Sequence, residues 1–162
     1  MQQILEVFFN LAILERAWPF LVRGVEMTVA LSLVIVPLGV ASGLAVAMLY
    51  HLHFKWLNRV LMAYVDFFRA FPPLVLLLFI YGGLPFLGLD LPLFATVALA
   101  FLLNTSSYYG EIFRAGLESV PAGQTEAARS TGLSRGQTML WVILPQATRN
   151  VLPDLISNTL EV

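Results

Sequence analysis

Few residues in this sequence could do chemistry, and their spacing argues against catalysis. The chain has no cysteine, which excludes thiolate metal sites and cysteine nucleophiles. Lys55, the only lysine, follows Phe54, whereas a phosphate-binding Gly-x-x-x-x-Gly-Lys loop needs glycine at that place. His51 and His53 are two residues apart, but a metal site would need further ligands that are not nearby. We therefore expect no catalytic residue, no metal and no cofactor.

Charged residues of opposite sign recur at helical spacing. Glu111 and Arg114 are three residues apart, as are Asp66 and Arg69, so each pair could meet on one face of a helix. We interpret both as structural pairs rather than substrate contacts. Glu161 differs, because a carboxylate inside a membrane costs about 2.5 to 3.5 kcal/mol and usually faces the interior of a bundle. We expect Glu161 to line a path through the protein.

The most informative stretch is the polar one between Pro121 and Pro145. Pro121 can open a helix, and Gly132 is well placed to end it in a left-handed conformation. Ser134 and Gln137 match a capping box for a second helix, and Pro145 marks the end of that helix. The residues thus predict two short helices joined by a tight glycine turn.

The first of these helices carries a patch of small side chains. Ala127 and Ala128 project little, and Glu126 and Arg129 offer charged contacts beside them. Such a helix suits docking in a groove of a partner protein. It equally suits an amphipathic helix packed on its own protein, and spacing leaves both interpretations open.

The composition places these residues in a membrane protein. The 162 residues are 59% hydrophobic and 12% charged, with a mean hydropathy of +0.82. Soluble domains are roughly 45 to 50% apolar and about 25% charged. The net charge of -1 and the scarcity of cations exclude a nucleic-acid-binding protein. Residues 27–54 carry no Asp, Glu, Lys or Arg, and as a helix they would be roughly 42 Å long against about 30 Å of hydrocarbon.

We therefore predict an all-α, polytopic membrane protein embedded in a lipid bilayer. Residues 1–19 are expected to form an N-terminal interfacial segment, and residues 20–162 a membrane domain. Within that domain we predict helices at about 22–50, 57–84 and 91–116, a cytoplasmic loop at about 118–145, and the start of a fourth crossing at 147–162. Because this last segment stops before it could span, we expect the chain to be incomplete at its C-terminus.

Two further features of the crossings can be predicted. Pro72 and Pro73 remove backbone donors, so the second crossing should be kinked or begin irregularly there. Lys55 and Arg59 follow the first crossing and four arginines follow the third, whereas residues 84–93 contain no cation. Short cytoplasmic loops retain Lys and Arg, so we expect a multi-pass protein with its N-terminus outside.

The polar loop resembles the EAA loop in the membrane subunits of ATP-binding-cassette importers. The pattern of that loop is Glu-Ala-Ala, then Gly, then Ile-Leu-Pro, and it is met here by Glu126, Ala127, Ala128, Gly132, Ile143, Leu144 and Pro145. Val120, Pro121, Gly123, Gln124, Gln146 and Ala147 fit the longer version found in the polar amino acid permeases.

Two other stretches share this resemblance. The segment around Arg69 and Pro72 is similar to the Phe-Arg-Gly-Thr-Pro segment of the family's second helix, and the segment from Tyr109 to Gly116 is similar to its Ala-Tyr-x-x-Glu-x-x-Arg-x-Gly segment. Ala70 and Phe71 stand where the family has Gly-Thr, so this chain departs from the pattern near the translocation path.

The resemblance implies a type I importer transmembrane-domain fold in a bacterial cytoplasmic (inner) membrane. It implies a permease subunit that moves a polar amino acid and pairs with a separate ATPase subunit, a second permease subunit and an extracytoplasmic solute-binding protein. The ATPase-coupling residues would be Gly123, Gln124, Glu126, Ala127, Ala128, Gly132 and Pro145. Arg69, Pro72 and Glu161 are the residues expected at the translocation path.

Two other functions fit the composition. An ion-driven secondary transporter or channel subunit would work without an ATPase, but such carriers commonly have inverted repeats and ionisable groups at midplane, and neither is recognisable here. A membrane scaffold without a transport role would leave the two-helix loop unexplained.

Overall fold

The computed structural model describes residues 11–52 and 54–161, all of whose regular elements are helices. In chain order these are α2 (Leu11–Tyr50), α3 (Lys55–Ala70), α4 (Pro73–Gly83), the 3₁₀ turn η1 (Leu84–Leu87), α5 (Leu93–Glu118), α6 (Ala122–Ser130), α7 (Arg135–Thr138), the π-helical segment η2 (Met139–Ile143), α8 (Leu144–Asn150) and α9 (Leu152–Leu160). The chain divides into two units, residues 1–34 and 35–162. Residues 1–10, His53 and Val162 lie outside the description.

The first unit contains the N-terminal half of α2. Residues 1–10 of the predicted interfacial segment lie outside the described residues, and residues 11–19 are part of α2. Hydroxyl groups in this half are satisfied within the helix, since Thr28 donates to the Gly24 carbonyl and Ser32 to the Thr28 carbonyl, both at 2.9 Å. The apolar helix therefore exposes no unpaired hydroxyl donor at these two positions.

The second unit is built around α5, and the rest of α2 packs on it through small residues. Gly39, Gly43 and Ala47 recur every fourth residue and are buried. A Cβ added at Gly43 would lie 2.5 Å from the Tyr109 Cβ and 2.8 Å from the backbone nitrogen of Gly110. Such close backbone approach is typical of helix pairs in membranes, where small residues let van der Waals contacts form.

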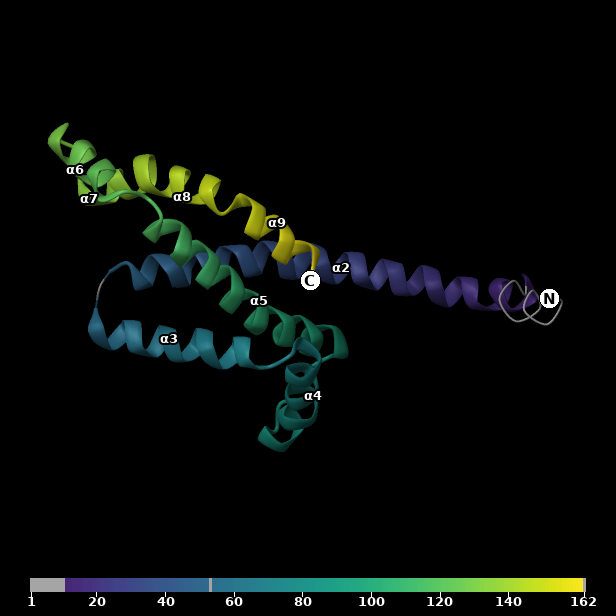
Figure 1. The fold of residues 1–162 in the computed structure, drawn as a ribbon. Helices are drawn as coiled ribbons and strands as arrows, with labels where there is room; N and C mark the ends of the chain where they lie inside the picture. The colour runs from purple at the N-terminus through teal and green to yellow at the C-terminus, as the bar shows by residue number, and fades with distance from the viewer. Residues whose placement is uncertain (1–10, 53, 162) are drawn as a thin grey trace. The chain divides into compact units, whose positions relative to one another are not determined.

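Helices α3 and α4 are the two halves of a sharply bent pair. The chain turns by 102° between Lys55–Ala70 and Pro73–Leu87, and Figure 1 shows α4 leaving the end of α3 in a new direction. Pro72 and Pro73 cause the break, because neither has a backbone N–H to continue the helix. The single helix expected at 57–84 is thus two helices, and the predicted irregularity lies at these prolines.

By length and composition, α2 is the one described helix that could cross a membrane alone, and the bent pair would be a second if counted as one span. α5, expected as the third crossing, does not qualify on these grounds. Its apolar first half is followed by the polar run from Asn104 to Tyr109, most of which is buried. Burial among neighbouring helices replaces lipid contact along this part of α5.

The remaining helices return along α5. α8 and α9 both pack on α5, and α6 packs on η2. The core of the unit comprises Ala47, Tyr109, Phe113, Leu117, Ile143 and Ala147. α6 and α7 are thereby held at the end of α5 that carries Glu118 (Figure 1).

Candidate functional site

The turn between α6 and α7 is fixed by a glycine in a left-handed conformation. Gly132 has a φ of 89°, as the sequence predicts. Its N–H donates to the Arg129 carbonyl at 3.1 Å, and the N–H of Leu133 donates to the Ala128 carbonyl at 3.4 Å. Together these two bonds form a Schellman motif, which satisfies the last carbonyls of α6. The Arg129 guanidinium adds a third bond, from Nη1 to the Leu133 carbonyl at 2.6 Å.

The predicted capping box at the start of α7 is confirmed. The Gln137 N–H donates to Ser134 Oγ at 3.3 Å, and the Ser134 N–H donates to Gln137 Oε1 at 2.8 Å. Both ends of the turn are therefore held by hydrogen bonds. We call α6, the Gly132 turn and α7 the coupling loop, after the role that the resemblance in sequence implies.

The expectation that the second helix ends at Pro145 is wrong. α7 runs through η2 into α8, and Pro145 lies in the first turn of α8. A proline ring in a regular α-helix clashes with the carbonyl four residues earlier. Here the wider π-helical turn precedes the proline, with the Leu144 N–H bonded to the Met139 carbonyl five residues back.

Five of the seven residues expected to couple to an ATPase lie along the short helix α6, while Gly132 lies in the turn after it and Pro145 in α8. Gly123, Gln124, Glu126 and Ala127 are exposed on α6, whereas Ala128 is only 7% exposed. Of the patch of small side chains predicted at Ala127 and Ala128, which we call the smooth patch, only Ala127 is therefore exposed, because Ala128 is buried against the rest of the chain. Gln124 Oε1 accepts a bond from Gln146 Nε2 at 3.3 Å, which links α6 to α8 beside Pro145.

The polar run of α5 supplies hydrogen bonds to the break between α3 and α4. The side-chain amide of Asn104 donates to the carbonyls of Phe68 and Phe71, at 3.0 and 3.3 Å. The Phe68 carbonyl loses its usual partner because Pro72, four residues later, has no N–H to donate, and Phe71 lies in the extended break after α3. A buried carbonyl left without a donor would cost about 1 to 3 kcal/mol. Asn104 thus stabilises the irregular backbone beside Pro72.

A small polar cavity of about 140 Å³ lies between α5, α9 and the start of α4. Glu161 lines it together with Pro73, Phe101, Asn104, Thr105, Tyr108 and Asn158. Thr105 Oγ1 and Asn158 Nδ2 are buried with no hydrogen-bond partner in the described part of the chain. Arg69 lies outside the cavity, with its guanidinium 5.1 Å from the Tyr108 ring. Tyr108 thus lines the cavity with Glu161 and also contacts Arg69.

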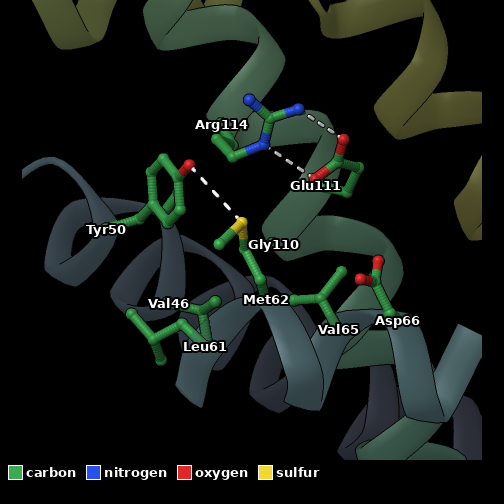
Figure 2. A pocket seen from close by; sticks show the side chains of 10 residues that line it. Val46, Tyr50, Leu61, Met62, Val65, Asp66, Gly110, Glu111 and Arg114 are labelled. Atoms are coloured by element: carbon green, nitrogen blue, oxygen red, sulfur yellow. Dashed lines mark hydrogen bonds and ion pairs between the residues drawn. The ribbon is translucent and has the colours of Figure 1, made fainter. Parts of the chain in front are cut away.

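Figure 2 shows a second cavity, of about 230 Å³, between the end of α2, α3 and α5. Arg114 is its central charge and binds Glu111 through two hydrogen bonds, of 2.6 and 2.8 Å. The predicted Glu111–Arg114 pair is thus confirmed, and Glu118 joins it at 2.6 Å. The Tyr50 ring lies 5.7 Å from the same guanidinium, within cation–π range.

The matching Asp66–Arg69 pair does not form among the described residues. Asp66 instead lines the cavity of Figure 2, while Arg69 lies over Tyr108. Residues that the sequence interpretation missed are Asn104, Thr105 and Tyr108. Their signal is a run of uncharged polar residues inside an apparent crossing, which a search for charges passes over.

Comparisons with known proteins agree with this architecture. Residues 35–162 match the family described as "Binding-protein-dependent transport system inner membrane component". The chain is 34% identical to the probable amino-acid ABC transporter permease protein YckA of Bacillus subtilis, over 96% of this chain and 69% of that protein. It is 33% identical to the glutamine transport system permease protein GlnP of Escherichia coli, over 91% of this chain and 68% of that protein.

Two solved structures share the fold. One, titled "Crystal structure of an amino acid ABC transporter with histidines", gives a TM-score of 0.80 and 38% identity over 92% of this chain and 69% of that one. The other, the MetNI methionine ABC transporter in inward-facing conformations, gives a TM-score of 0.74 and 25% identity over 91% of this chain and 71% of that one. The chain thus spans about two thirds of each protein compared here. It belongs to the family of inner membrane components of binding-protein-dependent transport systems.

Proposed function

We propose that this chain is a permease subunit of an ATP-driven importer for a polar amino acid, with the coupling loop docked on a separate ATPase subunit. The family is a transporter permease component and is not itself catalytic. Its further partners are a second permease subunit and an extracytoplasmic solute-binding protein. The chain crosses the bacterial inner membrane several times, with its N-terminus outside and the coupling loop in the cytoplasm. Because the relatives compared are ABC permeases, an ion-driven carrier is not proposed.

The observation that carries this proposal is the fixed, exposed helix α6. Gly123, Gln124, Glu126 and Ala127 face solvent on it, and the Schellman motif and the capping box hold its far end rigid. ATP-driven motion of the ATPase can shift the equilibrium between two arrangements of the permease helices only if the ATPase interacts differently with α6 in each arrangement. Because α6 is held rigidly and is connected to α5 and α8, it can transmit this difference in interaction to the membrane helices.

Docking can be tested with a bulky residue on the smooth patch. In the full-length permease co-expressed with its ATPase, Ala127→Arg should reduce the co-purified ATPase roughly tenfold or more, because blocking a central contact costs about 2 kcal/mol or more. Ala122→Arg is the matched control. Ala122 is also an exposed alanine of α6, but it projects roughly 140° away from Ala127. Equal recovery of ATPase with both variants would contradict docking through α6.

We further propose that the polar cavity beside Glu161 lies on the translocation path. A polar amino acid carries an ammonium and a carboxylate group, and the cavity offers the Glu161 carboxylate together with the unpaired Asn158 amide and Thr105 hydroxyl. Arg69 and Pro72 act at its border. Arg69 lies over Tyr108, and Pro72 creates the break that Asn104 caps.

Substitution of Glu161 tests this placement. In the full-length, reconstituted transporter, Glu161→Ala should lower uptake of the preferred amino acid by roughly tenfold and change its rank against other amino acids, because an ammonium group loses its charged partner. Asp154→Ala is the control, since Asp154 is an exposed carboxylate on α9, the helix that Glu161 follows, and lines none of the cavities described above. An unaltered substrate profile in Glu161→Ala would remove this residue from the path.

A further inference from the structure

A third cavity, of about 650 Å³, lies between the last turn of α2 and the coupling loop. Its wall carries two guanidinium groups, those of Arg129 and Arg135, beside the apolar side chains of Met48, Leu52 and Met139. Phosphate groups bind to paired guanidinium groups, and hydrocarbon packs on methionine and leucine. The cavity thus combines the two chemistries of an anionic amphiphile.

The two arginines have guanidinium N–H groups that bond no described residue. Within the described residues both ion pairs belong to Arg114, so neither Arg129 nor Arg135 has a carboxylate partner there. Arg129 uses one N–H on the Leu133 carbonyl, which fixes its position beside the turn. The cavity therefore has a positive wall that the described chain does not neutralise.

A buried hydroxyl lining the same cavity also has no partner. Thr138 is only 2% exposed, and its Oγ1 is buried without a hydrogen bond to any described residue. Other helical hydroxyls of this chain donate to the carbonyl four residues back, as Thr148 does to Leu144 at 2.9 Å. An unsatisfied buried hydroxyl is unfavourable, so an acceptor inside the cavity would relieve it.

Two exposed tryptophans lie close in sequence to residues that line the cavity. Trp56, near the start of α3, is 77% exposed, and Trp141, two residues after Met139, is 75% exposed. Exposed tryptophans mark the level of lipid headgroups, where an indole ring has one apolar and one wet side. A basic cavity between helices at this depth suits the headgroup of an anionic lipid.

We propose that this cavity binds the phosphate of an anionic phospholipid, with Arg129, Arg135 and the Thr138 hydroxyl as donors and Met48, Leu52 and Met139 against the acyl chains. The inference rests on the proposed function for one point, that the coupling loop lies at the cytoplasmic face of the membrane. The lipid lies on a different side of α6 from the docking patch. Thr125 and Arg129 are four residues apart and share the cavity face, whereas Ala127 projects roughly 160° to 200° from them.

Native mass spectrometry of the assembled transporter, with added phosphatidylglycerol or phosphatidylcholine, tests this inference. We expect phosphatidylglycerol to be retained and phosphatidylcholine to be lost. Arg135→Gln and Thr138→Val should each weaken retention of phosphatidylglycerol by roughly five- to tenfold. Arg149→Gln should leave it unchanged, because Arg149 is an exposed arginine on α8 that does not line the cavity. The elution volume of each variant confirms that it is folded.

Three results would overturn the inference. The first is equal retention of both lipids in all variants. The second is displacement of phosphatidylglycerol by inorganic phosphate alone, which would make the site one for a free anion. The third is loss of the lipid whenever the ATPase is bound, which would make the cavity part of the ATPase interface. Failure of the ATPase to co-purify, with phosphatidylglycerol still retained by the permease, would contradict the proposed docking and leave the lipid site supported.

Discussion

Replacing Gly43 by alanine is expected to destabilise the packing of α2 on α5 more than any other single methyl group added to a glycine of this chain. The new Cβ would lie 2.5 Å from the Tyr109 Cβ, 2.8 Å from the Gly110 nitrogen and 2.9 Å from the Tyr109 carbonyl carbon. Two of these atoms belong to the backbone and the third is fixed to it, so a side-chain rotation cannot relieve the clash. The helices must move apart.

Moving the two helices apart should lower the free energy of unfolding substantially, because the displacement disturbs other contacts along the interface. Tyr109 is completely buried, and its hydroxyl is 2.6 Å from Thr159 Oγ1 on α9, so displacing it disturbs a second helix contact. Overpacking of a well-packed core usually costs about 1 to 3 kcal/mol, and a backbone clash belongs at the upper end. The midpoint of unfolding in a denaturing detergent titration of the purified permease should fall accordingly.

Gly82→Ala provides the matched control for Gly43→Ala. Gly82 lies in α4 with a helical conformation, and a Cβ there would meet no described atom within 4 Å. Alanine should leave stability unchanged or raise it by up to about 1 kcal/mol, because it loses less backbone entropy in a helix than glycine does. Equal midpoints for the two variants would show that α2 does not approach α5 at Gly43.

Local signals in the sequence predict the local features of this fold. A glycine after a run of helix formers predicts the positive φ at Gly132, and Ser134 with Gln137 predicts the capping box. The prolines at 72 and 73 predict an irregular helix, since the missing N–H groups are a property of the residue itself. Each of these features depends on neighbours within a few positions of the chain.

Features that depend on distant contacts escape the sequence. Glu111–Arg114 and Asp66–Arg69 have the same spacing and charge, but only the first pair forms among the described residues. Arg69 lies over Tyr108, thirty-nine residues further along the chain, and its backbone carbonyl accepts the Tyr108 hydroxyl at 3.5 Å. Spacing within one helix cannot reveal such a competitor on another helix.

The candidate sites divide in the same way. The coupling loop can be recognised from the sequence because its two helices and its turn are contiguous in the chain. The Glu161 cavity is assembled from α4, α5 and α9, and only the carboxylate stands out before the fold is known. Uncharged lining residues such as Asn104 and Asn158 can be recognised as part of a site only from their position in the fold. The burial of the polar run of α5 depends on the helices packed around it.

Replacing Gly132 by valine is expected to uncouple ATP hydrolysis from transport while leaving membrane insertion intact. The φ of 89° at Gly132 is one that L residues rarely adopt, and β-branched residues least of all. Forcing valine into it costs about 1 to 2 kcal/mol or more, and the turn would relax by losing its two bonds to the α6 carbonyls of Ala128 and Arg129. The rigid connection between α6 and α7 would then be lost, although the core around α5 contains no residue of this turn.

A second substitution at Gly132 separates the conformation of this turn from the loss of glycine itself. Asparagine tolerates the left-handed region far better than valine does, so Gly132→Asn should keep most of the coupling although its side chain is similar in size. Transport per ATP hydrolysed, measured in proteoliposomes of the assembled transporter, should fall roughly five- to thirtyfold for Gly132→Val, the change that 1 to 2 kcal/mol produces in an equilibrium. If valine transports as well as glycine, or if asparagine fails as badly as valine, then the left-handed turn is not what joins the docked helix to the rest of the protein.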